Sequence, residues 1–331
     1  MAQIGLAPAA SAAEWEMNVG GFMEQWFGYA KGATRDNEGF DEQTDAEIAF
    51  EPQITLDNGI QIGVDVQLEA QTDGDQIDQQ YAWVEGNFGR LEMGSNDSAP
   101  YLMAIGLPSA GLGLDSGDAP DWIGAINGLL ITTTYNLTAE DDSSEKVNYF
   151  TPRFSGFQLG VSYIPELAQD IDAPPNEANG VRDNAFGIGL NYEGSFNDFS
   201  IGASAGYMYF GDDDALAGDE PEDYGFGLSL GYGGFTLTGT YNQLDDSSAG
   251  DIESFGVALM YETGNLGLSL GYIHGDDDAS QADSDAFEFG ASYTLGPGVS
   301  THFSFFYVNQ DSAFGSDLEG AAAVGGLALS F

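Results

Sequence analysis

Apolar side chains recur at every second position along most of this chain, and that period limits what it can fold into. In NYFTPRFSGFQLGVSYIP, residues 148–165, the apolar row runs through Tyr149 and then Phe157, Leu159, Val161 and Tyr163. Successive side chains of a β-strand point to opposite faces, so this period predicts strands with one apolar face. The intervening PRFSG predicts a tight turn, which makes the stretch a hairpin.

The same alternation continues through the chain. Counting a first strand near residues 15–30, we find about sixteen strands at a spacing of roughly 20 residues, and a tilted membrane strand needs about 9–11. Tyr81 and Trp83 are predicted to belong to such a row, which continues into Leu91 and Met93. Later rows are Phe186, Ile188, Leu190 and Tyr192; Tyr224, Phe226, Leu228, Leu230 and Tyr232; and Thr301, Phe303, Phe305 and Tyr307.

The predicted connections alternate in length. Short ones, such as DNG at 57–59, GSFND at 194–198 and the glycine pair at 233–234, carry hairpin-turn residues. Longer, acidic connections lie between them, for example 31–44, 164–184 and 210–223. Short turns at one rim and long loops at the other are typical of outer-membrane barrels, and an even strand number places both chain ends at the short-turn rim.

A soluble β-sandwich also alternates, because one face of each sheet packs on the protein core. Here the second parity holds Gly, Ser, Asn, Gln and acids with very few bases, as in Gly187, Gly189 and Asn191. Tyrosines such as Tyr232 and Tyr261 end the apolar rows, where aromatic rings suit the bilayer interface. The sequence therefore favours a transmembrane barrel, with a soluble acidic all-β secreted protein as the alternative.

The charge balance narrows the class of partner. Six Lys and Arg stand against 54 Asp and Glu, for a net charge of −48, so the chain lacks the basic patch that nucleic acid requires. The absence of Cys excludes disulfides and thiolate metal sites. There is also no run of about 18 apolar residues that would form a membrane helix.

The first residues predict export. Residues 1–13, MAQIGLAPAASAA, end in small residues before Glu14, as a secretory signal does at its cleavage site. A basic n-region is missing, since the first Lys is Lys31. We expect a signal-peptide remnant over 1–13 and a single barrel domain over 14–331.

Three stretches make the chain resemble the Gram-negative trimeric outer-membrane porins, of the alphaproteobacterial general diffusion type. NYFTPRFSGFQLGVSYIP resembles a strand–turn–strand of that family, YAWVEGNFGRLEMGSND at 81–97 resembles the hairpin before its third loop, and VGGLALSF, ending in Phe331, resembles its assembly signal. The resemblance covers about residues 14–331. It implies an all-β fold, a 16-stranded antiparallel transmembrane β-barrel with a long third loop folded into the pore. It also implies a homotrimer among outer-membrane lipids, for passive diffusion of small hydrophilic solutes and ions.

If the apolar parity faces lipid, the other parity faces water. A base on the lipid face near the midplane costs about 2–4 kcal/mol and an acid costs less, which favours inward charges. The pore-lining candidates are Glu47, Glu51, Asp65, Glu69, Arg90, Glu92 and Lys146. Any one of them could instead lie near a rim without an effect on conduction.

The connection over 95–145 departs from the alternating pattern, because it is the longest and is partly apolar. A long loop of that kind is usually functional or packed against something. By the resemblance it is the constriction loop, and the alternative is a cap at the trimer interface. Its acids are Asp115, Asp118 and Asp121, and the basic residues that would oppose them are Arg90, with Arg35 and Arg153 as further candidates.

Acids around a constriction attract cations, so we expect mild cation selectivity. A substrate-preferring channel for a sugar or a specific cation is the alternative. We expect no cofactor, although acidic loops such as 212–214 and 276–278 are candidates to bind Ca²⁺, which favours oxygen ligands. A solvated acidic surface is the plainer interpretation of those loops. No nucleophile motif, phosphate-binding loop or histidine pair points to an enzyme.

Overall fold

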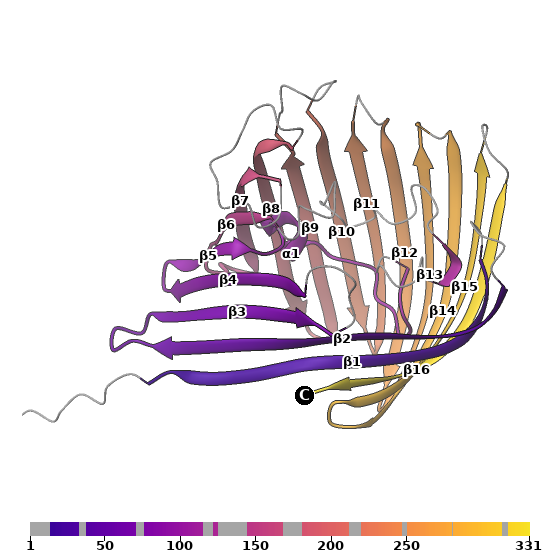
Figure 1. Cartoon of the computed structure of the whole chain (residues 1–331), viewed down its shortest axis with the longest axis horizontal. Helices are drawn as coiled ribbons and strands as arrows, with labels where there is room; N and C mark the ends of the chain where they lie inside the picture. The colour runs from indigo at the N-terminus through magenta and orange to yellow at the C-terminus, as the bar shows by residue number, and fades with distance from the viewer. Residues whose placement is uncertain are drawn as a thin grey trace, which may run out of the picture.

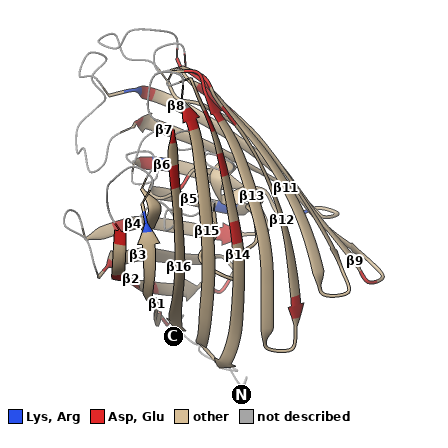
Figure 2. Ribbon diagram, turned by 90° about the vertical axis from the view of Figure 1, so that its right-hand side faces the viewer, with Lys and Arg blue, Asp and Glu red and all other residues tan. Residues whose placement is uncertain are grey.

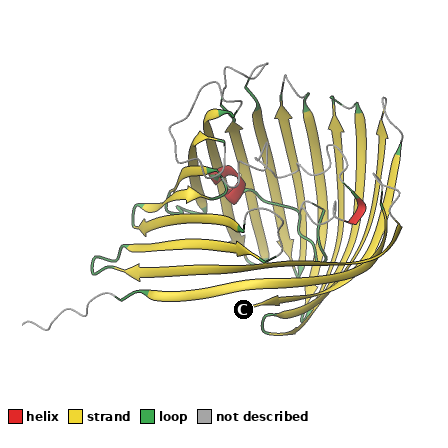
Figure 3. Cartoon of the chain, in the orientation of Figure 1, coloured by secondary structure: helices red, strands yellow, loops and turns green. Residues whose placement is uncertain are grey.

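The structure, a computed structural model, describes residues 14–32, 38–70, 76–114, 122–124, 144–167, 181–211, 220–246, 250–279, 281–312 and 317–331. The signal-peptide prediction for residues 1–13 falls outside these ranges. Strands dominate the described part (Figures 1 and 3). In chain order the elements are β1 (Glu16–Lys31), β2 (Glu38–Thr55), β3 (Gln61–Glu69), β4 (Ile77–Gly86), β5 (Gly89–Ser95), α1 (Ala99–Met103), β6 (Glu145–Phe150), β7 (Phe157–Glu166), β8 (Asp183–Phe196), β9 (Phe199–Tyr209), β10 (Glu222–Tyr232), β11 (Phe235–Asp245), β12 (Ile252–Thr263), β13 (Leu266–Asp277), β14 (Ala282–Gly296), β15 (Val299–Ser312) and β16 (Leu318–Ser330).

The strands form one closed barrel, in which each strand pairs antiparallel with its neighbours in sequence. β1 closes it by pairing with β2 on one side and β16 on the other, for example Trp26 with Gly326. Gly21 and Phe331 extend the β1–β16 ladder by exchanging backbone hydrogen bonds of 3.1 Å in both directions. The predicted 16-stranded antiparallel barrel is therefore confirmed.

The two rims differ as the connection lengths predicted. Connections of two to six residues follow the even-numbered strands β2 to β14, and every connection longer than six residues follows an odd-numbered strand. The turn between β10 and β11 consists of Gly233 and Gly234, whose φ values of 57° and 85° suit a two-residue hairpin turn that disfavours side chains. Because the strand number is even, both the start of β1 and the end of β16 lie at the short-turn rim.

The outer face of the barrel carries the apolar parity. In β8 the exposed residues alternate with buried ones, and Phe186, Ile188 and Leu190 are among the exposed. Aromatic side chains pair across neighbouring strands near both rims of this face. The ring pairs are Phe157–Tyr192, Phe199–Tyr232 and Phe235–Tyr261 near the short turns, and Tyr163–Phe186 and Tyr272–Phe287 near the long loops. Rings in two such belts suit the two interfaces of a membrane.

One stretch of the predicted apolar rows is wrong. Tyr81 and Trp83 do not share a face with Leu91 and Met93, because the register pairs Tyr81 with Gly94 and Trp83 with Glu92, on the inner face. Trp83 lies over Gly63, where a Cβ atom would come within 2.4 Å of the indole ring. An aromatic side chain alone therefore did not mark the lipid face.

The inner face also contains apolar residues: one buried cluster lies on β7 to β9 and β11, and a larger one lies on β12 to β16 and β1. Phe306 and Val308 of β15 are buried there, together with Trp26 of β1. Leu114 and Trp122, from the connection between β5 and β6, belong to the same cluster. Part of this connection therefore packs against the inside of the wall. Within the described ranges, no helix is long and apolar enough to cross a membrane.

Candidate functional site

A segment of the long connection, residues 98–114, runs along the inner wall; we call it the inner segment. It begins with α1, which contacts β7, β8 and β9, and it then passes across the wall toward β15 (Figure 1). Serine hydroxyls on the inner face accept hydrogen bonds from its backbone N–H groups. The bonds are Ala99 N to Ser162 Oγ at 2.6 Å, Ile105 N to Ser204 Oγ at 2.9 Å, Ala110 N to Ser269 Oγ at 2.9 Å and Leu112 N to Ser304 Oγ at 2.7 Å. The chain path of the segment is thus fixed by four different strands.

Glu288 of β14 is the charged anchor of this segment. Its carboxylate accepts hydrogen bonds from Ser109 Oγ at 2.8 Å and from the Gly113 N–H at 3.0 Å. Ser304 Oγ donates a further bond of 2.9 Å from the neighbouring strand. Glu288 is only 4% exposed, so these donors replace the water that a buried carboxylate would lose. His302 adds a bond of 2.9 Å between its Nδ1 and the Ala110 carbonyl.

Glycine brings the wall close enough for these bonds. A Cβ atom at Gly290 of β14 would lie 2.3 Å from Ser269 Oγ and 2.6 Å from the backbone nitrogen of Gly111. Glycine is the residue that permits such a close approach of two backbones. The alternation of Gly and Ser on the inner parity is therefore a packing surface for the inner segment.

Glu92 and Lys146 hold the two ends of the same connection. Lys146, only 3% exposed, donates from Nζ to the backbone carbonyls of Asn96 and Ser144. Glu92 accepts a bond of 2.8 Å from the Asn96 side chain. Both residues have the inward parity predicted for them, but they are buried at the base of the connection.

Arg90 lies on the inner face between two carboxylates. Its Nε donates to Glu92 at 2.6 Å, and its Nη1 lies 3.3 Å from Glu85. The guanidinium also stacks over Trp83, 4.3 Å from the ring centre. The acids predicted to oppose Arg90, namely Asp115, Asp118 and Asp121, lie outside the described residues, as does Arg35.

Arg153 lies in the turn between β6 and β7, at the short-turn rim. It pairs with Glu193 at 3.0 Å and donates to the Asn191 side chain at 2.9 Å and to the Gly156 carbonyl at 2.8 Å. These partners all belong to β8 or to the turn itself. In the structure, Arg153 therefore binds the β6–β7 turn to β8.

The remaining candidates form an acidic strip on the inner face of β2 and β3. Glu47 and Glu69 stand directly opposite each other in the ladder, and Glu51 and Asp65 share their parity. Asp65 is 8% exposed and accepts a bond of 3.2 Å from the Tyr81 hydroxyl. Figure 2 shows how carboxylates outnumber bases over the barrel as a whole.

Metal binding at the acidic loops stays a prediction. Asp212–Asp214 falls outside the described residues, while Asp276 pairs with His274 at 3.4 Å on the outer face. In the described ranges, no three Asp, Glu or His side chains are grouped so as to hold a metal ion.

Residues 1–313 match the sequence profile of the Gram-negative porin family. The chain belongs to this family. The resemblance noted in the sequence is thus confirmed, and the porin forms a channel in the outer membrane. An uncharacterized protein of Rickettsia typhi, RT0064, is 29% identical over 147 residues, a match that spans 38% of this chain and 33% of that protein.

Solved porin structures share the barrel. The anion-selective porin from Comamonas acidovorans superposes with a TM-score of 0.70 at 14% identity, over 96% of this chain and all (100%) of that one. The trimer form of OmpT from Vibrio cholerae superposes with a TM-score of 0.66 at 14% identity, over 96% of this chain and 99% of that one. A mutant form of the Rh. blastica porin superposes with a TM-score of 0.59 at 18% identity, over 96% of this chain and 100% of that one. At such identities the likeness concerns the fold.

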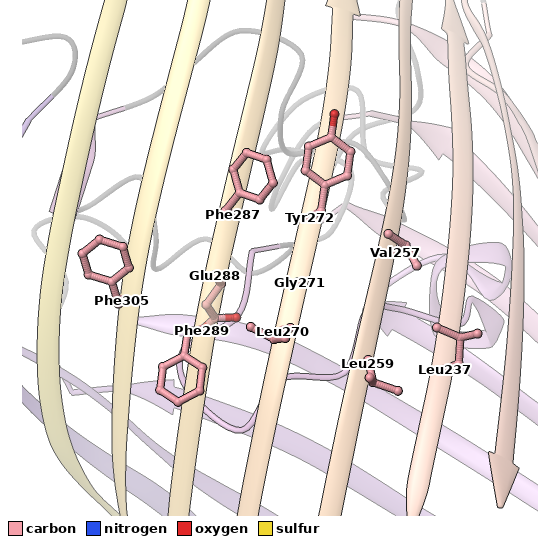
Figure 4. A pocket seen from close by; sticks show the side chains of 10 residues that line it. All are labelled: Leu237, Val257, Leu259, Leu270, Gly271, Tyr272, Phe287, Glu288, Phe289 and Phe305. Atoms are coloured by element: carbon pink, nitrogen blue, oxygen red, sulfur yellow. The ribbon is translucent and has the colours of Figure 1, made fainter.

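An apolar hollow of about 400 Å³ opens on the outer face of the porin, over β11 to β15 (Figure 4). Phe287 and Phe289 of β14 line it, whereas Glu288 between them belongs to the inner parity that anchors the inner segment. The hollow therefore lies on the outside of the barrel, away from the permeation path.

The sequence analysis missed three parts of the site: the wall serines, Glu288, and the inward Phe306 and Val308. A signal was present for the first, because Ser and Gly alternate with apolar residues in the late strands. A second signal lay in FSFFYV at 303–308, where apolar residues occupy both parities and so predict that both faces are covered.

Proposed function

We propose that this porin is a cation-preferring diffusion channel for small hydrophilic solutes. The observation that carries the proposal is the imbalance of charge on the inner face. Within the described part of the chain, no Lys or Arg forms an ion pair with Glu47, Glu51 or Asp65, while Arg90 is held by two carboxylates. Lys146 is buried at the base of the long connection. Cations are attracted to pores lined by such acids.

The fold by itself does not set the selectivity. The Comamonas acidovorans porin is anion-selective and has the same barrel at 14% identity. The sign of the preference therefore depends on the inner side chains, and here those of β2 and β3 are acidic. Screening extends about 8 Å at physiological salt, so these charges act on ions that pass close to this wall.

The experiment is the reversal potential of the purified porin in a planar bilayer across a KCl gradient. Cation preference would give a potential of the sign set by K⁺ diffusion. A potential of zero, or one of the sign set by Cl⁻, would contradict the proposal and leave the barrel in place.

We also propose that the porin assembles as a homotrimer. OmpT of Vibrio cholerae, which shares the fold, has a trimer form. The mass of the detergent-solubilised complex, measured by light scattering, distinguishes a trimer from a single barrel, and single-channel steps in groups of three are the matching electrical result. A single-barrel mass with single steps would contradict it.

A further inference from the structure

We propose that the porin binds small organic ammonium ions in a hollow of about 380 Å³ on its inner wall, which we call the inner hollow. Residues of β14, β15, β16 and β1 line it, near the short-turn rim. The inner hollow is separate from the acidic strip on β2 and β3. The site names a class of solute for the channel, and its role in permeation rests on the proposed cation preference.

A row of three residues forms the floor of the inner hollow. Glu24 of β1 pairs with Ala328 of β16, and Ala328 pairs with Ser300 of β15. All three have the inward parity and line the inner hollow. Neighbouring strands lie about 4.8 Å apart, so about 10 Å separates the backbones of Glu24 and Ser300. The small side chain of Ala328 fills little of this space, which leaves room for a ligand between the two polar residues.

The next row toward the long loops is closed by two rings. Trp26 pairs with Gly326, and Gly326 pairs with His302. The two rings meet edge to face with their centroids 5.9 Å apart, and a Cβ atom at Gly326 would come within 2.5 Å of the indole. His302 also binds the carbonyl of Ala110 in the inner segment. The inner hollow therefore lies on the short-turn side of the inner segment.

The polar groups of the inner hollow are left as acceptors. Glu24 is partly exposed; its Oε2 accepts the Trp26 N–H at 3.0 Å, and its Oε1 has no hydrogen-bond partner in the described ranges. The Ala110 carbonyl can only accept, so Nδ1 of His302 carries a proton and Nε2 of the neutral ring is an acceptor. The Ser300 hydroxyl, 2.7 Å away, donates to Nε2 and keeps its own lone pairs for a donor. Within the described ranges, no Lys or Arg lines the inner hollow.

The lining selects a cation that has a carbon body. An ammonium group has three N–H donors and no acceptor, which complements the carboxylate of Glu24 and the hydroxyl of Ser300. Phe22, two residues before Glu24 on the same face of β1, supplies an apolar surface for a ring or short chain attached to that group. A volume of about 380 Å³ falls within the roughly 300–1,000 Å³ of small-molecule sites. An anionic solute would be repelled by Glu24.

The test titrates benzylammonium chloride against the single-channel K⁺ conductance of the assembled porin, at constant ionic strength. We expect a saturating fall in conductance, because a bound organic cation occupies the lumen beside the inner segment and repels K⁺. Ammonium chloride supplies the charge without the carbon body, and benzamide supplies the ring without the charge. Neither should produce a saturating fall over the concentrations at which benzylammonium does.

Two variants locate the site. Glu24→Gln keeps an acceptor for Trp26 but removes the charge, and it should raise the half-effect concentration at least about tenfold, as the loss of one hydrogen bond to a charged group does. Phe22→Ala should raise it about fivefold through loss of the ring contact. The matched control is Glu16→Gln, which has the same strand and parity. Glu16 lies eight positions from Glu24, about 27 Å along the strand and beyond the screening length of about 8 Å, so the control should respond like the wild type.

Heat-modifiable migration verifies the folding of each variant, and Phe22→Ala carries the test if Glu24→Gln does not fold. The site would be overturned by an unsaturable response to benzylammonium or by an equal response to ammonium or benzamide. A wild-type half-effect concentration in the folded variant would overturn it as well.

The reversal potential across a KCl gradient, recorded before any probe is added, separates the two proposals. Cation preference without a saturating response to benzylammonium refutes the site alone. A saturating response that moves with Glu24→Gln, in a channel without cation preference, refutes the proposed selectivity alone.

Discussion

The carboxylate of Glu288 lies 2.8 Å from the hydroxyl of Ser109, a residue 179 positions away in the chain. One residue belongs to the barrel wall and the other to the inner segment, so this contact joins the two parts. Around it, the Gly113 N–H and the Ser304 hydroxyl bind the same carboxylate. Through this one carboxylate, the wall therefore binds the inner segment at two of its residues, Ser109 and Gly113.

Replacing Glu288 by Ala should loosen the inner segment. Each donor left buried without an acceptor costs about 1–3 kcal/mol, and Glu288 satisfies three donors. We expect noisier single-channel currents and a lower temperature for the shift in electrophoretic migration. Glu319→Gln, an exposed acid on the outer side of β16, is the control. Quiet currents with the wild-type conductance in Glu288→Ala would show that the segment does not need this anchor.

A methyl group at Gly290 should displace the inner segment, because the new Cβ would meet the Gly111 nitrogen at 2.6 Å. Overpacking of this kind typically costs about 1–3 kcal/mol. We expect Gly290→Ala to lower thermal stability and to change the conductance. Gly239→Ala is matched in chemistry, but its Cβ would meet its nearest atom at 3.8 Å, so it should behave like the wild type. Equal melting temperatures for the two variants would contradict the close packing.

Lys146→Met should weaken the base of the long connection. The ammonium group binds the carbonyls of Asn96 and Ser144, which a thioether cannot do. We expect a loss of about 1–3 kcal/mol in stability, as for buried groups that lose a partner. Limited proteolysis between residues 96 and 144 should become faster. The control is Lys31→Met, at the exposed end of β1, which should leave the cleavage rate unchanged. Equal cleavage rates in the two variants would show that Lys146 does not stabilise the base of the long connection.

Arg90→Gln should strengthen the proposed cation preference. The change leaves the carboxylates of Glu85 and Glu92 without their guanidinium partner, which adds negative charge to the inner face. The reversal potential across a KCl gradient should move further toward the K⁺ value. Arg153→Gln, in the short turn beside the 65% exposed side chain of Glu193, should change it less. A larger shift in Arg153→Gln would place the selective region at the short-turn rim.

Much of the barrel was predictable because strand alternation is a local property. The outward Phe186, Ile188 and Leu190 follow directly from the period of two, as do the turns at Gly233 and Gly234. Parity also gave the inward direction of Lys146 and Asp65. It did not give the burial of Lys146, which depends on the backbone of a distant connection that folds over it.

The inner segment was less predictable because its partners are far away in sequence. Nothing in residues 98–114 specifies that Ser269 or Ser304 will receive its N–H groups. The inward Phe306 and Val308 look like additional lipid-facing residues until the cluster with Leu114 is known. Trp83 was assigned to the wrong face for a similar reason, since its partner is a glycine on the neighbouring strand.

The serine contacts also impose an order of assembly. The bonded residues are separated by 63 positions for Ser162, 99 for Ser204, 159 for Ser269 and 192 for Ser304. Contacts between such distant residues form late, because long chain loops must close first. The inner segment can thus be secured along its whole length only after β15 has joined the wall. An unfinished sheet would hold its early portion and leave the rest unsupported, so the channel interior takes its final shape only once β15 is in place.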